Sequence, residues 1–368
     1  MDLDEIQLDL GAPVAELTRR LIDIPSVSGD ERAIADAVEA ALRRYPHLRV
    51  ARNGNAVVAV LDTGAAERVI LAGHLDTVPI NDNVPGSLSA DGLELVGRGS
   101  VDMKAGVAVM LSLAATLTHA SRSIAYVFYD LEEVESTRNG LGRIARDNPE
   151  WLAGDFAVLL EPTSGVIEGG CNGTLRAEVT IPGVAAHSAR SWKGTNAIHG
   201  AAPLLTALAS YEAETISVDG LEYREGMNAV GIRGGIAGNV VPDECVVTIN
   251  YRFAPSWDVD KAQRRLEDVV HGSGVEGPVI VWTDVAAGAR PGLDAPMARA
   301  FANAVSSQGG EQARAKLGWT DVARFGELGI PAVNFGPGNP ELAHADDERC
   351  SVAEIDACRA ALAAWLAG

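Results

Sequence analysis

The sequence lacks the features that mark several common classes of protein. It has 30 basic against 50 acidic residues, a formal net charge of −20, which argues against nucleic acid or an anionic membrane surface as the main partner. Its four cysteines form no CxxC pair, as is typical of reduced thiols in a cytoplasm. No apolar run has transmembrane length, and the acidic first residues do not resemble a secretory signal. We therefore expect a cytoplasmic protein with no nucleic-acid or membrane partner.

Apolar residues, by contrast, make up 47% of the 368 positions, enough for two packed domains. Helix and strand patterns alternate over 13–160 and again after 289, and the strands are nearly continuous apolar runs. This pattern predicts an α/β fold whose sheet is buried on both faces. We expect helices at 13–24, 31–45, 104–117, 297–307 and 352–366, and strands at 56–61, 68–72, 124–129, 156–160 and 332–336.

Between these two parts the pattern changes. LRAEVTIPG and VVTINYRF alternate apolar with polar residues, as half-exposed strands do. Helices are expected at 196–210 and 258–270, and the element order βαββαβ matches a ferredoxin-like unit. The sequence thus predicts a catalytic α/β domain, 1–174 and 289–368, interrupted by a small inserted domain, 175–288.

Polar residues able to bind metal ions stand at the ends of the apolar strands, where ligands gather in α/β sheets. They follow VILAG, IAYVFYD, FAVLL and AVNFG, or precede a helix, and comprise His74, Asp76, Asp102, Glu132, Glu133, Glu161 and His344. Imidazole and carboxylate groups suit zinc, and one aspartate can bridge two ions. A dinuclear site activates a water and stabilises a developing oxyanion. One of the adjacent glutamates would bind metal, and the other would act as general base.

These stretches carry a resemblance to a known family. GHLDTVP, GRGSVDMKAG, DLEEVES, EPT, GVAAHSAR and AHADDE occur in order over essentially the whole chain. The chain resembles the zinc-dependent amidohydrolases and exopeptidases that include succinyl-diaminopimelate desuccinylase, acetylornithine deacetylase and glutamate carboxypeptidase. The resemblance implies a zinc-exopeptidase-like catalytic domain with a mixed, mostly parallel sheet. It also implies that the inserted domain is a lid and the interface of a homodimer.

The family pattern implies a role for each matching residue. It makes His74 and Glu161 ligands of one metal, Glu133 and His344 ligands of the other, and Asp102 the bridge, followed by a cis peptide to Met103. Asp76 would orient His74, and Glu132 would be the general base that deprotonates a metal-bridging water. His187 would reach the partner subunit's site and stabilise the oxyanion. The implied cofactors are two divalent ions, zinc or else cobalt.

Several stretches, among them AGHLDTVPINDN and ELGIPAVNFGPG, are closest to the actinobacterial-type desuccinylases. The resemblance therefore implies hydrolysis of N-succinyl-LL-2,6-diaminopimelate, a lysine and peptidoglycan precursor, to succinate and LL-2,6-diaminopimelate. A succinyl carboxylate needs a cation or donor, and Arg176, Asn239 and Arg252 are the candidates. Trp319 is a departure, because many desuccinylases have a small residue there.

Other readings stay open at this point. Another small N-acyl amino acid could be the substrate, as in an acetylornithine deacetylase or a dipeptidase. A non-catalytic metal-binding relative would show a broken base or ligand, and the sequence shows none. A structural protein with coincidental acids would bind no stoichiometric zinc, so metal content separates it from the enzymes.

Overall fold

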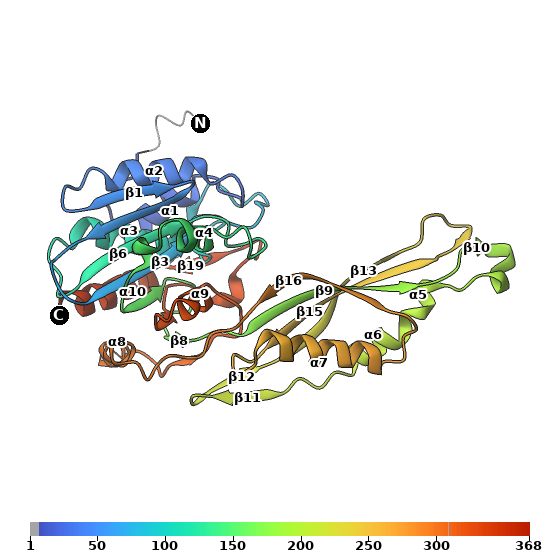
Figure 1. Cartoon of the computed structure of the whole chain (residues 1–368). Helices are drawn as coiled ribbons and strands as arrows, with labels where there is room; N and C mark the ends of the chain where they lie inside the picture. Colours follow the sequence, from blue (N-terminus) through green and yellow to red (C-terminus); the bar gives the residue numbers. More distant parts are fainter. Residues whose placement is uncertain (1–6, 308) are drawn as a thin grey trace. The chain divides into compact units, whose positions relative to one another are not determined.

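The chain folds into two compact units (Figure 1). The computed structural model describes residues 7–307 and 309–368. Unit 1 comprises Met1–Gly170, Pro291–Arg314 and Asp321–Gly368, and unit 2 comprises Cys171–Arg290 and Ala315–Thr320. The segment 175–288, expected as the insertion, lies within unit 2.

Unit 1 contains an eight-stranded sheet in the order β1-β2-β6-β3-β7-β18-β8-β17. β3 pairs in parallel with β6 and β7, and β7 with β18, whereas β1, β2 and β8 are antiparallel to their neighbours. All of β6 and β7 is buried, as parallel strands covered on both faces require. This confirms the predicted mixed, mostly parallel sheet. The strands are β1 (Arg49–Asn53), β2 (Ala56–Leu61), β3 (Arg68–His74), β6 (Ser123–Tyr129), β7 (Phe156–Leu159), β8 (Glu168–Gly169), β17 (Arg314–Ala315) and β18 (Ala332–Asn334).

Helices cover this sheet. One large apolar cluster joins alternate residues of the strands to α1, α2, α3, α8 and α10, and α3 is buried almost throughout. α4 contacts β2, and α9 contacts β7 and β18. The helices are α1 (Val14–Ile22), α2 (Arg32–Leu42), α3 (Lys104–Thr116), α4 (Gly140–Asp147), α8 (Pro296–Ser307), α9 (Val322–Glu327) and α10 (Val352–Ala367), with short 3-10 turns η2 (Pro149–Leu152) and η4 (Pro340–Leu342).

A second, three-stranded sheet in unit 1 has the order β19-β5-β4. Its strands are β4 (Ser87–Leu88), β5 (Glu94–Val96) and β19 (Arg349–Ser351), and β19 pairs with β5 so that Arg349 lies opposite Val96. The residues after β5 therefore run beside the residues before β19, and the amide of Gly97 donates to the carbonyl oxygen of Glu348 at 2.9 Å. The sequence did not predict this small sheet.

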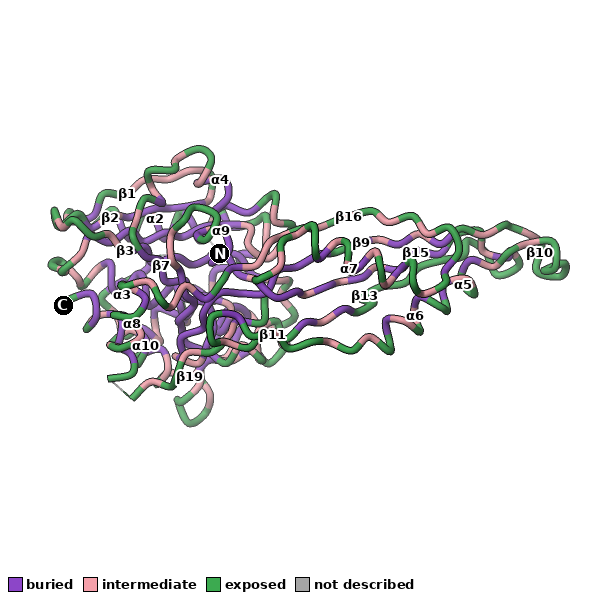
Figure 2. The backbone as a smooth tube through the Cα atoms, turned by 60° about the horizontal axis from the view of Figure 1, so that its bottom comes forward, coloured by how far each residue is buried: buried purple, intermediate pink, exposed green. Residues whose placement is uncertain are grey.

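Unit 2 has a four-stranded antiparallel sheet in the order β13-β15-β9-β16, with helices packed on one face. Along the chain the order is βαββαβ, which confirms the predicted ferredoxin-like unit. Figure 2 shows much of this unit exposed, in contrast to the strands of unit 1. Its elements are β9 (Gly173–Pro182), β10 (Ala186–His187), η3 (Ser188–Lys193), α5 (Ala197–Gly200), α6 (Ala202–Ala209), β11 (Thr215–Val218), β12 (Leu221–Arg224), β13 (Gly226–Gly234), β14 (Val240–Val241), β15 (Glu244–Phe253), α7 (Val259–Gly272) and β16 (Val279–Ala286).

The helix expected over 196–210 is divided in the structure into α5 and α6. Pro203 stands in the first turn of α6, where its missing N–H costs no hydrogen bond. In the middle of one long helix the same proline would remove a hydrogen bond and clash with the preceding turn. Across the described residues, none of the helices combines the length and apolarity needed to cross a membrane.

Candidate metal centre

The strand ends of unit 1 bring the predicted residues of the catalytic domain together. β3 and β6 are paired in parallel with His74 opposite Tyr129, and β3 and β7 with Ala72 opposite Leu159. Since these strands are parallel, the residues that follow them lie at one edge of the sheet. Asp76, Glu132, Glu133 and Glu161 all come from these strand ends.

His74 is buried, and its ring contacts carboxylates on both sides. Nε2 lies 3.0 Å from Oδ1 of Asp102 and 4.0 Å from Oε1 of Glu161. Nδ1 lies 3.0 Å from the carbonyl oxygen of Asp76 and 3.5 Å from its Oδ1. These contacts fix the ring plane and direct Nε2 toward Asp102 and Glu161.

The buried carboxylate of Asp76 also anchors the loop after β6. Its Oδ1 accepts a hydrogen bond from the amide of Glu132 at 3.0 Å, and its Oδ2 accepts one from the amide of Glu133 at 3.1 Å. The hydroxyl of Ser28 donates to Oδ2 at 2.7 Å. One side chain thus holds the imidazole and the backbone of both glutamates in register. Ser28 was not predicted, because no motif distinguishes it from other serines.

His344 reaches the same place from the end of the chain. Its Nε2 lies 2.9 Å from Oε1 of Glu133 and 3.4 Å from Oδ2 of Asp102. His344 has a φ of 66°, in the left-handed region that residues other than glycine adopt uncommonly. Asp102 therefore lies between the two histidines, and its peptide bond to Met103 is cis, as the resemblance implies.

The histidines respond to these carboxylates. Hydrogen bonds with Asp102 and Glu133 raise the pKa of His344 to about 10. Burial alone would lower the pKa of His74, but hydrogen bonds with Asp102 and Asp76 raise it well above its ordinary value. The surrounding carboxylates thus favour the protonated form of both rings.

The pKa values of the two adjacent glutamates are also raised, but here burial is the main cause. Burial raises the pKa of Glu132 well above its ordinary value despite the nearby His74, and the carboxylates of Glu133 and Glu161 raise it further. Burial also raises the pKa of Glu133, and the charge of Asp102 adds to that effect. A carboxylate with a raised pKa is suited to accept and return a proton near neutral pH.

The acidic residues after β6 raise the question of how four carboxylates are tolerated so close together. Asp130 forms a salt bridge with Arg143 at 2.5 Å, and Glu135 is exposed to solvent. Only Glu132 and Glu133 then remain to share the partly buried space at the strand ends. Asp130 thus has an arginine of its own, apart from the metal-binding group.

The donor set fits divalent metal ions. His74, Asp102 and Glu133 each offer one ligand atom, and these atoms all lie within 4.8 Å of one another. Imidazole nitrogen and carboxylate oxygen are ligands that zinc and cobalt share. Glu161 and His344 lie beside this group at the distances given above. The number of ions and the assignment of each ligand to an ion stay predictions.

The residues predicted in the insertion lie in unit 2, in two places. His187 pairs with Val240 across the β10–β14 ladder, and the amide of Ser188 donates to the carbonyl oxygen of Asn239 at 2.9 Å. His187 and Asn239 are thus neighbours, and both are exposed. Nδ1 of His187 accepts a hydrogen bond from the amide of Ala189 at 3.1 Å, which leaves Nε2 as the outer nitrogen.

The two predicted arginines lie on the face of the sheet opposite the helices. Arg176 of β9 pairs with Asn250 of β15, and Arg252 stands two residues further along β15. Nε of Arg252 donates to Oδ1 of Asn250 at 3.2 Å. Both arginines therefore stand near Asn250 on the same face of the sheet. Trp319, also in unit 2, donates from Nε1 to the carbonyl oxygen of Ala287 at 3.0 Å.

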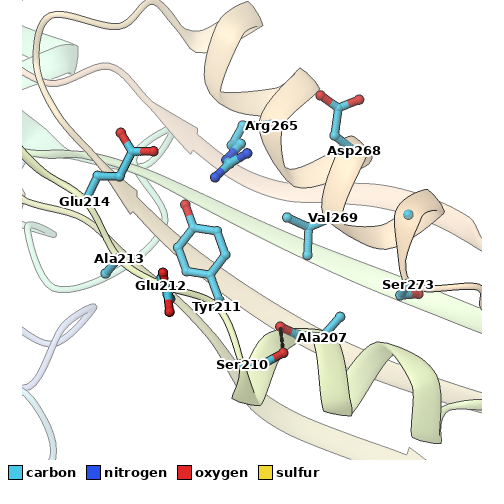
Figure 3. A pocket seen from close by; sticks show the side chains of 11 residues that line it. Ala207, Ser210, Tyr211, Glu212, Ala213, Glu214, Arg265, Asp268, Val269 and Ser273 are labelled. Carbon is cyan, nitrogen blue, oxygen red and sulfur yellow. Dashed lines mark hydrogen bonds between the residues drawn. The ribbon is translucent and has the colours of Figure 1, made fainter.

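A pocket of about 640 Å³ lies elsewhere in unit 2, between α6 and the second half of α7 (Figure 3). Arg265 points toward the ring of Tyr211, with its guanidinium carbon 5.4 Å from the ring centroid. Three acids, Glu212, Glu214 and Asp268, also line it. Its described lining contains no histidine and none of the predicted site residues, so it is separate from the metal-binding group.

Comparison with known proteins places these observations in a family. Residues 70–368 match the model of "Peptidase family M20/M25/M40". The chain is 52% identical over 362 residues to a Mycobacterium tuberculosis protein named "Putative succinyl-diaminopimelate desuccinylase DapE", covering 98% of this chain and 100% of that one. It is 47% identical over 362 residues to the succinyl-diaminopimelate desuccinylase of Corynebacterium glutamicum, covering 97% and 96%.

A solved structure supports the fold independently. The tripeptidase of Staphylococcus aureus superposes with a TM-score of 0.78 at 19% sequence identity, covering 98% of both chains. At that identity the likeness speaks for the architecture alone. It shows that an experimentally determined structure shares this fold.

Proposed function

Because the chain belongs to peptidase family M20/M25/M40, we propose that it is a metal-dependent amidohydrolase that cleaves N-succinyl-LL-2,6-diaminopimelate to succinate and LL-2,6-diaminopimelate. The assignment of the substrate rests on sequence identity. The chain is 52% and 47% identical, over nearly full length, to two proteins named as succinyl-diaminopimelate desuccinylases, the first of them as putative. The group of His74, Asp102 and Glu133 supports the chemistry. We place the enzyme in the cytoplasm, where its four buried cysteines, which are not disulfide-bonded, would stay reduced.

Two divalent ions, zinc or else cobalt, would complete this site. His74 and Glu161 would hold one ion, Glu133 and His344 would hold the other, and Asp102 would serve both. When bound, the ions polarise the amide carbonyl and lower the pKa of the attacking water. Asp76 keeps the ring of His74 in place through Nδ1 and fixes the loop of Glu132 and Glu133.

Glu132 moves the proton in both halves of the reaction. Its carboxylate takes a proton from the attacking water as the oxygen bonds to the amide carbon. It then gives that proton to the amine nitrogen as the carbon–nitrogen bond breaks, so that one water is consumed and one carboxylate and one amine are formed. The raised pKa of Glu132 suits both roles, since the group must be a good base first and a good acid afterwards.

Unit 2 supplies recognition in this proposal. Arg176 and Arg252 bind the succinyl carboxylate, and Asn239 donates from its amide. His187 stabilises the oxyanion with the outer ring nitrogen in the site of a partner subunit. Its exposure is consistent with a role that needs a group from outside its own unit.

The apolar surface of unit 2 supports a homodimer formed through this unit. β13 is an edge strand of the four-stranded sheet, and Val230 and Ile232 on it are 60% and 54% exposed. Trp192 and Ile236, in the flanking segments, are 77% and 84% exposed. An exposed apolar edge strand invites pairing, and pairing with its own copy closes a symmetric dimer. Sedimentation of the wild type and of Ile232→Lys tests this, with a monomeric wild type contradicting it.

The direct test of function compares two hydrolysis rates of the metal-loaded enzyme. One is measured with N-succinyl-LL-2,6-diaminopimelate and the other with N-acetylornithine. We expect strong preference for the succinyl substrate, and loss of both activities when the ions are chelated. Metal analysis of the purified protein should find two ions per chain. Preference for N-acetylornithine would assign the protein to deacetylation, and activity that survives complete metal removal would contradict the proposed chemistry.

A further inference from the structure

Glu348 is a buried carboxylate with four hydrogen-bond donors around it. Oε1 accepts from the amides of Val101 at 2.9 Å and Asp102 at 3.0 Å. Oε2 accepts from the amide of Gly99 at 3.0 Å and from Nη1 of Arg98 at 2.8 Å. The side chain is 1% exposed, so this charge depends on these four donors in place of water.

Arg98 also bonds to the backbone near Glu348 and to a loop earlier in the chain. Besides Glu348, its Nη1 donates to the carbonyl oxygen of Ala345 at 3.2 Å, and its Nε donates to that of Pro79 at 3.1 Å. Its side chain is only 4% exposed. The amide of Gly97 adds a backbone bond to the carbonyl oxygen of Glu348. These bonds join residues 97–101, which precede Asp102, to residues 345–348, which follow His344.

We propose that Glu348 and Arg98 are positioning residues that hold Asp102 and His344 at the separation that two metal ions require, and so set the affinity for those ions. Glu348 binds the backbone of Asp102 directly and stands four residues after His344. These are the two ligands that meet from opposite ends of the sequence, with Nε2 of His344 3.4 Å from Oδ2 of Asp102. This inference rests on the proposed dinuclear site.

The Glu348 carboxylate holds the loop of Asp102 in place and does not itself bind the ions. All four donors of Glu348 are accounted for by the Arg98–Asp102 loop, so its carboxylate is committed to that loop. Loss of a residue that orients a metal ligand without binding the metal typically lowers metal affinity or activity about 10–100-fold. The sequence placed Glu348 within AHADDE and Arg98 within GRGSVDMKAG but gave neither a role.

The test is Glu348→Gln, studied as the full-length protein. The glutamine amide would direct a donor at N–H groups where an oxygen now accepts. We expect zinc affinity, measured by competition with a chromophoric chelator, to fall about 10–100-fold. The absorption spectrum of the cobalt-loaded protein should also change, which simple destabilisation would not cause. At saturating metal, KM should stay near that of the wild type.

The matched control is Glu225→Gln in unit 2. Glu225 is also a buried carboxylate and accepts hydrogen bonds from Tyr211 and Tyr251, at 2.9 and 3.1 Å. It should lower the melting temperature while leaving zinc affinity unchanged. If Glu348→Gln does not fold, Arg98→Lys is the second variant. Lysine keeps the positive charge but cannot donate from both Nε and Nη1, so we expect a smaller drop in zinc affinity.

The outcomes separate this inference from the proposed function. Wild-type zinc affinity and an unchanged cobalt spectrum in Glu348→Gln, or in Arg98→Lys if that variant alone folds, would overturn the positioning role alone. A wild-type protein that binds no zinc would overturn the proposed site and this inference with it. Reduced affinity in Glu348→Gln beside normal affinity in Glu225→Gln would establish the role.

Discussion

The two units hold their predicted functional residues in opposite ways. In unit 1 the imidazoles and carboxylates contact one another, and backbone amides and buried side chains fix them. In unit 2 His187, Asn239 and Arg176 are exposed. Under the proposed function, the groups for ion binding and proton transfer are therefore held in place before substrate arrives, whereas the recognition residues of unit 2 remain open to solvent. Variants in unit 1 should therefore change metal affinity or kcat, and variants in unit 2 should act without changing metal content.

The largest effect should come from Glu132→Gln in unit 1. The variant removes the proton carrier but no proposed metal ligand, so kcat should fall about 10²–10⁴-fold while both ions stay bound. Glu135→Gln, an exposed neighbour, is the matched control and should have wild-type kcat. Steady-state kinetics measures kcat, and metal analysis checks that both ions are still bound. A Glu132→Gln enzyme that keeps most of its kcat would contradict the role of Glu132 as general base.

In unit 2, His187→Ala should give the next largest effect. Loss of one oxyanion donor typically costs about 10²–10³-fold in kcat, and metal content should be unchanged. His199→Ala, an exposed histidine of α5, serves as the control. Should His187→Ala raise KM alone, the residue would belong with substrate recognition and the oxyanion role would be wrong.

Arg252→Ala and Arg176→Ala would sharpen the comparison further. A hydrogen bond to a charged group contributes about 1.5–3 kcal/mol, so KM for the succinyl substrate should rise about 10–100-fold for the residue that binds its carboxylate. N-acetylornithine, which lacks that carboxylate, should be affected less. Arg264→Ala on α7 is an exposed control. Equal effects on the two substrates would show that neither arginine reads the succinyl group.

The smallest effect concerns pH and the metal-free protein. The pKa of His344 is raised to about 10 from about 6.5 in an unfolded chain, so its contribution to stability is complete below about pH 6.5 and is lost as pH rises toward 10. Ion binding displaces that proton and becomes more favourable over the same range. The difference in melting temperature between metal-loaded and metal-free protein should thus widen between about pH 6.5 and 9.

Thermal unfolding at several pH values measures that difference. His344→Gln, which carries no titrating proton there, should show a flatter dependence on pH. A difference that narrows with rising pH in the wild type would contradict the assignment of His344 as a ligand that loses a proton.

Much of unit 1 could be predicted because its strands are continuous apolar runs. A run such as that of β6 has a clear end, and parallel strands put such ends at one edge of the sheet. His74 and the Glu132–Glu133 pair stand at those ends, so the pattern of apolar runs is sufficient to group them. His344 was grouped with them although the turn GPGNPELA separates it from its strand, AVNFG.

What could not be predicted depends on packing between distant segments. Asp346, Asp347 and Glu348 are three consecutive acids, and only the structure shows that the first two are exposed and the third is buried against the Arg98 loop. The β11–β12 hairpin and the small β19-β5-β4 sheet are too short to leave a periodic pattern. In unit 2 the exposed residues leave no packing signal, so their roles depend on resemblance.

The metal-binding group draws on both ends of the chain, since His74 lies in β3 and His344 comes only a short way before the last helix. A ribosome synthesises all of unit 2 between these two histidines. A nascent chain therefore lacks one of the proposed ligands until translation has reached His344. The complete proposed ligand set can form only after both histidines, and the whole of unit 2 between them, have been made.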